Sequence, residues 1–156
     1  MTAEPTAAEL VERLGMQPIA GEGGWWAPGT RTPELSSITA LLADTDDGFS
    51  ALHVLTIHEG WQWLDGDPLE LVRLHPDGTA DTVTLDRHTH QAVVPAGVWQ
   101  GARTLGAWTL FGCWCAPAFT DDCFTLGERS ALLAAYPGYA AHVTALTRDP
   151  TPEVPR

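Results

Sequence analysis

The sequence predicts a mainly all-β protein, in which short antiparallel strands form a sandwich or barrel. Strand-like runs follow one another from Ser50 to Cys115, and Gly, Pro or Asp turns separate them. Such close spacing of short strands is typical of small β-sandwiches and barrels. The chain has 156 residues, which is enough for a single domain with a packed core.

The N-terminal part is predicted to hold one helix and an irregular arm. Thr6 and Glu9 form a capping-box pattern ahead of an apolar stripe, and Gly15 ends the helix. The stretch 16–33 is rich in Gly and Pro, which indicates an irregular arm or an edge strand. Ser36–Leu42 is the first regular strand that the pattern predicts.

The rest of the chain divides into strands and then helices. Further strands are expected at Ser50–Leu55, Glu59–Leu64, Leu69–Leu74, Ala80–Leu85, Gln91–Val94, Gln100–Thr104 and Trp108–Cys115. The pattern becomes helical from Glu128 to Arg148, with a break at Pro137 and Gly138. Residues 149–156 are proline-rich and are expected to form a loose tail, so the core is expected to span about residues 8–146 of one domain.

Composition narrows the classes of partner. The net charge is −12, which disfavours nucleic acid and anionic membrane surfaces as partners. All eight basic residues are arginine, so a lysine Schiff base is excluded. The chain has no apolar run of membrane-spanning length and an acidic N-terminus, and we expect a cytoplasmic protein. Three cysteines without a zinc-like spacing are expected to be reduced and partly buried in strands.

The segment Phe49–Gly66 is where the sequence concentrates its functional signals. Strand alternation places Glu59, Trp61 and Trp63 on one face. Two tryptophans beside a carboxylate are unusual on a solvent-exposed face and indicate an aromatic pocket with one acidic group. We therefore expect a small-molecule site here.

The spacing within this segment resembles the first motif of the cupin superfamily. That motif contains two histidines separated by one residue, then a glutamate and a later glycine. Here these four positions hold His53, Leu55, Glu59 and Gly66. The second cupin motif is Pro-x-Gly-x-x-His, and residues 95–100 read PAGVWQ, which ends in glutamine. The resemblance implies a cupin jelly roll, or double-stranded β-helix, with a short N-terminal helix and C-terminal helices.

The chain is also similar to a small single-domain cupin branch catalogued as a domain of unknown function. The similar pieces are GEGGWW, SSITALL, SALH, EGWQWLDGDPLEL, QAVVPAGVWQGA and LFGCWCAPAF. The similarity spans about residues 8–146 and implies a homodimer that binds a small molecule. This sequence departs from the branch at Gln62, commonly histidine, and at Ala20, commonly proline.

The site residues allow several functions. In metal-dependent cupins three histidines and the glutamate hold a divalent metal, but Leu55 and Gln100 replace two of these ligands. His53, Glu59 and Gln100 would hold a metal only weakly, because a glutamine amide is a poor ligand for zinc, iron or copper. No cofactor is therefore expected to be required, and a weak divalent metal is the alternative.

Without a metal, His53 and Glu59 are predicted to be the catalytic proton-transfer pair of an isomerase, epimerase or lyase. The substrate would be a small carbonyl- or sugar-like metabolite. A non-catalytic binding or sensing protein is the second hypothesis, and a weakly metal-dependent cupin enzyme is the third. The non-functional alternative is that His53 and Glu59 only satisfy each other inside the barrel. The residues predicted to contact substrate are Gln100, Trp61, Trp63, Trp99, Trp26, Glu22 and Arg103. His88 and His90 are expected to be surface residues.

Overall fold

The computed structural model describes residues 3–149, so most of the predicted tail, 149–156, lies outside the described residues. The helices are α1 (Ala7–Arg13), α2 (Arg129–Ala135) and α3 (Ala140–Ala145), with 3-10 turns η1 (Asp121–Cys123) and η2 (Pro137–Tyr139). The strands are β1 (Gln17–Pro18), β2 (Trp25–Thr32), β3 (Leu35–Ala43), β4 (Ser50–Leu55), β5 (His58–Gly66), β6 (Leu69–Leu74), β7 (Ala80–Leu85), β8 (Gln91–Val94), β9 (Trp99–Thr104), β10 (Trp108–Ala116) and β11 (Phe124–Leu126).

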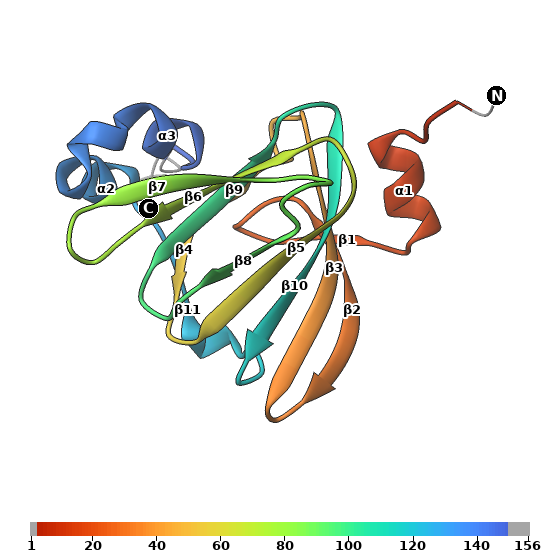
Figure 1. Ribbon diagram of the computed structural model, residues 1–156, viewed down its shortest axis with the longest axis horizontal. Helices are drawn as coiled ribbons and strands as arrows, with labels where there is room; N and C mark the ends of the chain where they lie inside the picture. Colours follow the sequence, from red (N-terminus) through yellow and green to blue (C-terminus); the bar gives the residue numbers. More distant parts are fainter. Residues whose placement is uncertain (1–2, 150–156) are drawn as a thin grey trace, which may run out of the picture.

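The strands form two antiparallel sheets, as expected for a jelly roll (Figure 1). The first sheet has the order β1-β2-β3-β10-β5-β8, and the second has the order β11-β4-β9-β6-β7. Strands distant in sequence therefore become neighbours: β10 lies between β3 and β5, and β9 lies between β4 and β6. The predicted fold class is confirmed.

Helices cover the outer faces of the two sheets. Figure 1 shows α1 beside β1–β3 on one side of the molecule and α2 and α3 on the other. Leu10 and Met16 pack with Trp108 under α1, on the first sheet. On the second sheet, Leu52 and Val72 belong to the cluster covered by the C-terminal helices. The interior between the sheets is a separate cluster of apolar side chains from both.

Several predicted elements are confirmed in detail. Thr6 caps α1: its Oγ1 accepts from the Glu9 amide at 3.2 Å, and the Thr6 amide donates to Glu9 Oε2 at 2.7 Å. The strands expected at Ser50–Leu55, Leu69–Leu74, Ala80–Leu85 and Gln91–Val94 have the predicted bounds. The C-terminal helical region is divided by η2 at the predicted Pro137–Gly138 break.

Two regions differ from the prediction. Much of the Gly- and Pro-rich arm is a strand, β2, which pairs with β3. Pro28 and Gly29 lie at a shift of register in this pairing, so their unfavourable strand propensity is accommodated at an irregularity. The short strand β11 is not predicted by the sequence pattern. It pairs with β4 opposite His53, and therefore forms part of the site's surroundings.

The motif glycine Gly66 ends β5 for two steric reasons. Its φ of 87° lies in the left-handed region, which glycine adopts without strain. A Cβ at this position would also lie 2.5 Å from the Trp108 ring. Glycine is thus the residue that allows the chain to turn tightly from β5 toward β6.

Among residues 3–149, no helix is long and apolar enough to cross a membrane. The expected cytoplasmic location stays a prediction.

Candidate functional site

The candidate site lies between the two sheets. His53 on β4 and Gln100 on β9 are register partners, so their side chains are neighbours on one face of the second sheet. Glu59 and Trp61 lie two residues apart on β5 of the opposite sheet, so their side chains share one face, as the sequence predicts. All four are buried, with exposed fractions of 2% for His53, 1% for Gln100, 8% for Glu59 and 2% for Trp61.

The His53 ring has a fixed orientation. Its Nδ1 lies 2.7 Å from the carbonyl oxygen of Ala51. Because a carbonyl oxygen only accepts, Nδ1 carries a proton and donates it there. In the neutral ring, Nε2 therefore holds the lone pair and is the basic atom. The ring also stacks on Phe124 of β11, at a centroid distance of 5.1 Å.

Glu22 is the carboxylate that faces this basic nitrogen. Glu22 Oε1 lies 3.5 Å from His53 Nε2, and Glu22 Oε2 accepts from Ser50 Oγ at 3.1 Å. The Glu22 side chain is 16% exposed, more than its buried partner, so it lies at the solvent side of the pair. The Glu22 carboxylate therefore lies where it can accept a hydrogen bond from Nε2 whenever that atom carries a proton.

Glu59 has a different environment. Burial raises the pKa of its carboxyl group to about 7; the charge of His53 opposes this increase, and the negative charge of Glu22 adds to it. Glu59 therefore exists as both acid and carboxylate near neutral pH. The structure places Glu22, rather than Glu59, against His53 Nε2, and this changes the roles expected for the predicted His53–Glu59 pair.

Two cysteine thiols complete the surroundings of Glu59. Cys115 on β10 is its register partner, and Cys115 Sγ lies 3.6 Å from Glu59 Oε2. Burial raises the pKa of both Cys113 and Cys115, and the nearby Glu59 charge adds to this. The thiols therefore remain protonated as weak donors toward the carboxylate. The prediction of free cysteines buried in strands agrees with Cys113 and Cys115, whereas Cys123 lies in η1.

Gln100 is held by a tryptophan from the opposite sheet. The Trp61 indole Nε1 donates to Gln100 Oε1 at 2.7 Å. The Trp61 ring stacks on Phe111, with an interplanar angle of 6°. Because the amide oxygen already accepts this bond, the amide NH₂ group of Gln100 is the part left to donate to an oxygen of a bound molecule.

These donors do not fit a resident metal. His53 Nδ1 donates to the Ala51 carbonyl oxygen and the Gln100 oxygen accepts from Trp61, so these two atoms are occupied, whereas Nε2 keeps its lone pair beside the Glu22 carboxylate. Within residues 3–149, no three His, Cys, Asp or Glu side chains are grouped so that they could hold a metal ion. Leu55, which replaces a metal-binding histidine of the cupin motif, packs with Cys115 and Cys123 in an apolar cluster. A metal role for His53, Glu59 and Gln100 is thus disfavoured by their geometry.

Two predicted contact residues lie away from the site. Trp99 and Arg103 are on the face of β9 opposite Gln100, because successive strand residues alternate. Trp99 packs in the cluster under the C-terminal helices, and Arg103 pairs with Glu70 at 3.1 Å on the outer face. The structure therefore places these two side chains on the face away from His53, Glu59 and Gln100, and their contact with a substrate stays a prediction.

Trp63 and Trp26 also face the interior, Trp63 on β5 beyond Trp61 and Trp26 on β2. Trp63 packs against the inter-sheet core, and its indole Nε1 donates to the Asp67 carbonyl oxygen at 3.1 Å. Trp26 is the register partner of Ala40, which belongs to the same core. Their contact with a substrate stays a prediction. His88 and His90 are exposed, as expected.

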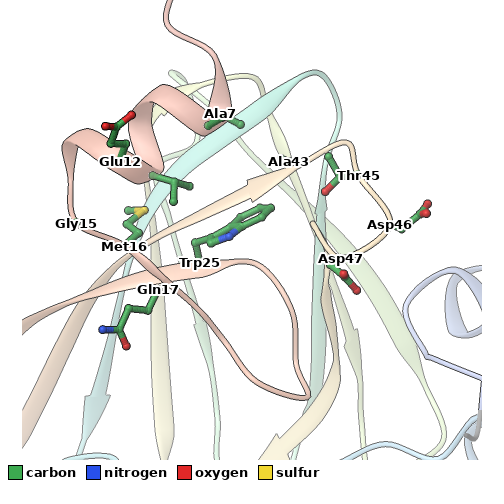
Figure 2. A pocket seen from close by; sticks show the side chains of 12 residues that line it. Ala7, Glu12, Gly15, Met16, Gln17, Trp25, Ala43, Thr45, Asp46 and Asp47 are labelled. Atoms are coloured by element: carbon green, nitrogen blue, oxygen red, sulfur yellow. The ribbon is translucent and has the colours of Figure 1, made fainter.

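A separate surface hollow lies outside the barrel. It has a volume of about 920 Å³ and lies between α1, Trp25 and the turn after β3 (Figure 2). A smaller one, of about 190 Å³, lies beside Phe49 and Arg103. Neither is lined by His53, Glu59 or Gln100. The polar side chains that line the larger hollow are exposed, whereas His53, Glu59 and Gln100 are buried together; the exposed ones are Glu12, Gln17, Thr45, Asp46 and Asp47.

Sequence reasoning misses several neighbours of the site. Phe124 comes from the unpredicted β11, and the spacing of Cys113 and Cys115 indicates only buried strand residues. Alternation along β10 could have revealed the cysteines, because Trp61 and Glu59 are their partners. Arg148 contacts the loop that carries Glu22, and no local pattern signals that contact.

Comparisons with known proteins agree with this architecture. The sequence profile described as Cupin superfamily (DUF985) matches residues 8–127. A crystal structure of a Shewanella oneidensis protein has 30% identity and a TM-score of 0.85, covering 94% of this chain and 100% of that one. A hypothetical protein from Leishmania major has 22% identity and a TM-score of 0.83, covering 93% and 100%.

More distant structures share the fold alone. Oxalate decarboxylase from Bacillus subtilis has 11% identity and a TM-score of 0.61, and the match covers 89% of this chain but 41% of that enzyme. A comparison with curated protein sequences finds no match.

Proposed function

Since the chain belongs to the cupin superfamily, in the family described as DUF985, we propose that it is an enzyme that binds a small carbonyl- or sugar-like metabolite in the barrel. The reaction proposed is an isomerisation, epimerisation or elimination by proton transfer. The cupin resemblance predicted from the motifs is confirmed; the reaction is our proposal.

One observation carries the proposal: a histidine with a fixed tautomer shares a buried site with a carboxyl group whose pKa is about 7. Paired groups with different proton affinities are how a site supplies an acid and a base at one pH. His53 Nε2 would take a proton from the carbon next to a carbonyl group, and Glu22 would stabilise the resulting imidazolium. Glu59 in its acid form would give a proton to the carbonyl oxygen, and Gln100 would orient the substrate.

A non-catalytic binding or sensing protein is the second candidate. The same buried aromatic and polar side chains would hold a ligand whether or not a proton moves. The third candidate, weak metal-dependent catalysis, is the least favoured, because the Gln100 oxygen already accepts from Trp61 and, within residues 3–149, no three His, Cys, Asp or Glu side chains are grouped to hold an ion.

Hydrogen exchange tests the proposal whatever the product of the reaction is. The protein is incubated in D₂O with small aldoses, ketoses and hydroxy-carbonyl compounds, and NMR follows loss of the proton next to the carbonyl. Proton transfer through His53 is expected to exchange that proton for deuterium, before and after treatment with EDTA. Exchange that disappears with EDTA and returns with one divalent metal would support the metal-dependent candidate.

The binding-protein candidate gives a different result in the same samples. A compound that binds the wild-type protein but not a His53→Gln variant, and that retains all its carbon-bound protons, would identify a binding protein and contradict catalysis.

We also propose that the protein acts as a homodimer that meets through the outer face of the first sheet. Most outward positions of this sheet that α1 leaves uncovered are uncharged, and Asp65, the register partner of Leu110, is a charged exception. The uncharged positions are Ser37, Thr39, Gly60, Gln62, Leu64, Gln91, Val93, Gly112 and Trp114. Leu64 and Val93 are 45% and 46% exposed. Two copies of a chain with a net charge of −12 would repel least through a face with few charged side chains.

A new charge on this face is expected to separate the copies. Leu64→Glu and Val93→Asp should each convert a dimer to a monomer in sedimentation velocity. Leu105→Glu, at an exposed leucine on the β9–β10 turn, is the control and should remain dimeric. A wild-type monomer, or dimeric charge variants, would contradict this interface.

A further inference from the structure

Arg148 lies just beyond α3 and contacts the loop that carries Glu22. Its Nη2 donates to the Glu22 carbonyl oxygen at 3.0 Å, and its Nε donates to the Gly21 carbonyl oxygen at 3.4 Å. Its Nη1 lies 3.4 Å from both the Asp46 carbonyl oxygen and the Asp47 carboxylate. One side chain thus joins the loop before β2 to the turn before β4.

The guanidinium group is itself held in place. Its central carbon lies 4.3 Å from the centroid of the Phe49 ring, within the range of a cation–π contact. The Arg148 side chain is 30% exposed, so its contacts are partly shielded from solvent. A planar group with this many directed donors needs a single orientation to make them all.

Backbone hydrogen bonds also hold the Glu22 loop: the Ala51 amide donates to the Glu22 carbonyl oxygen at 3.0 Å, and the Gly23 amide donates to the Ile19 carbonyl oxygen at 2.9 Å. Gly21, Gly23 and Gly24 all have φ in the left-handed region, at 79°, 106° and 75°, so the loop uses conformations that glycine favours. A Cβ on Gly23 would lie 2.2 Å from Arg148 Nη2, which shows how closely the arginine packs on the loop. A further backbone bond, from the Gly24 amide to the Asp47 carbonyl oxygen at 2.8 Å, joins the loop to the same turn that Arg148 contacts.

We propose that Arg148 is a positioning residue that fixes the Glu22 carboxylate opposite His53 Nε2. Its role in catalysis rests on the proposed function, but the positioning itself does not. Arg148 acts by holding the backbone on either side of the Glu22 side chain, rather than through His53 itself. Without Arg148, the loop keeps its backbone bonds but loses the side chain that ties Gly21 and Glu22 to the turn before β4, and we expect the carboxylate to shift from its 3.5 Å distance to His53 Nε2.

Lysine is not expected to replace this arginine. A lysine ammonium group at the same place keeps the positive charge beside Asp47, but it cannot direct separate donors to the carbonyl oxygens of Gly21, Glu22 and Asp46. Arg148→Lys therefore separates the role of geometry from that of charge.

The test follows the His53 ring by ¹H–¹³C NMR in protein labelled at its six histidines, without substrate. The His53 signals are assigned by their loss in His53→Gln. Glu22→Gln is expected to shift them, and Arg148→Ala and Arg148→Lys are expected to shift them in the same direction. Adding Arg148→Ala to Glu22→Gln should produce no further shift, because the carboxylate is already absent.

Arg87→Ala is the matched control. It removes one positive charge from an exposed loop, where Arg87 contacts His88, and it should leave the His53 signals unchanged. Thermal unfolding of each variant shows that the domain remains folded. If Arg148→Ala unfolds, Arg148→Lys provides the same comparison with less loss of packing.

Two results would overturn the proposal: wild-type His53 signals in the Arg148 variants, or additive shifts in the double variant. Absence of hydrogen exchange by the wild-type protein, with the expected NMR shifts, would refute only the proposed catalysis.

Discussion

Glu59→Gln is expected to lower the rate of hydrogen exchange by about 10²- to 10⁴-fold, the usual contribution of a positioned acid or base. Glutamine has nearly the same shape as a protonated glutamate, but its amide protons are too weakly acidic to be transferred to the carbonyl oxygen. The binding of the exchanged compound should therefore change little. The measurement compares exchange rates in D₂O with dissociation constants from isothermal titration calorimetry, for wild type and variant.

Glu34→Gln provides the control for this loss of activity. Glu34 is an exposed carboxylate in the turn between β2 and β3, and its replacement changes the net charge by the same amount. The Glu34→Gln variant should catalyse hydrogen exchange in the compound at the wild-type rate. Loss of binding in Glu59→Gln, with no exchange by the wild type, would indicate a ligand-binding role for Glu59 instead.

The same Glu59→Gln substitution is expected to stabilise the protein above neutral pH. Glu59 has a raised pKa in the folded chain, about 7 against 4.5 for the ordinary group. As pH increases through this interval, the unfolded chain releases the proton first, so the free energy of unfolding of the wild type decreases. Above pH 7 this cost is about 3 kcal/mol, at about 1.4 kcal/mol for each pKa unit.

Because glutamine does not titrate, the free energy of unfolding of Glu59→Gln should increase relative to wild type by about 3 kcal/mol between pH 4.5 and pH 8. Urea unfolding at the two pH values measures this change. Glu34→Gln, which removes an exposed carboxylate, should show much less. If the free energy of unfolding differed between Glu59→Gln and wild type by the same amount at both pH values, Glu59 would have its ordinary pKa in the folded chain.

A gain in stability together with a loss of exchange would have a clear physical meaning. A buried carboxyl group that costs stability at working pH is retained for a role that glutamine cannot fill. If Glu59→Gln were stabilised and the wild type catalysed no exchange, the carboxyl group would more simply serve to bind a ligand.

The strands and turns could be predicted because their signals are local. Alternating residues and Gly, Pro or Asp turns set the bounds of most strands from β4 to β10 closely. The arm is harder to predict, because Pro28 and Gly29 have low strand propensity. The segment nevertheless forms β2, because it pairs with β3 and a shift of register accommodates these two residues. The three-residue strand β11 depends on its partner β4 and carries too short a pattern to recognise.

The centre of the site is also predictable, but its pairing is not. Motif spacing identifies His53, Glu59 and Gln100, and the structure places all three between the sheets. The prediction for Trp99 and Arg103 rests on closeness in sequence, although alternation from Gln100 sends both outward. The contact between Glu22 and His53 joins segments from separate elements, and Arg148 is more distant still, so only the tertiary fold reveals these contacts.

Titration of the Glu59 carboxyl group tests the central claim most directly. Protein labelled with ¹³C at glutamate side chains is followed by NMR from pH 3 to pH 9, and the Glu59 signal is assigned with Glu59→Gln. A midpoint of about 7 is predicted. The midpoint should decrease in Glu22→Gln, because the neighbouring negative charge that raises the pKa has been removed. A wild-type midpoint at the ordinary value of 4.5 would leave no acid form near neutral pH and would contradict the proposed proton transfer.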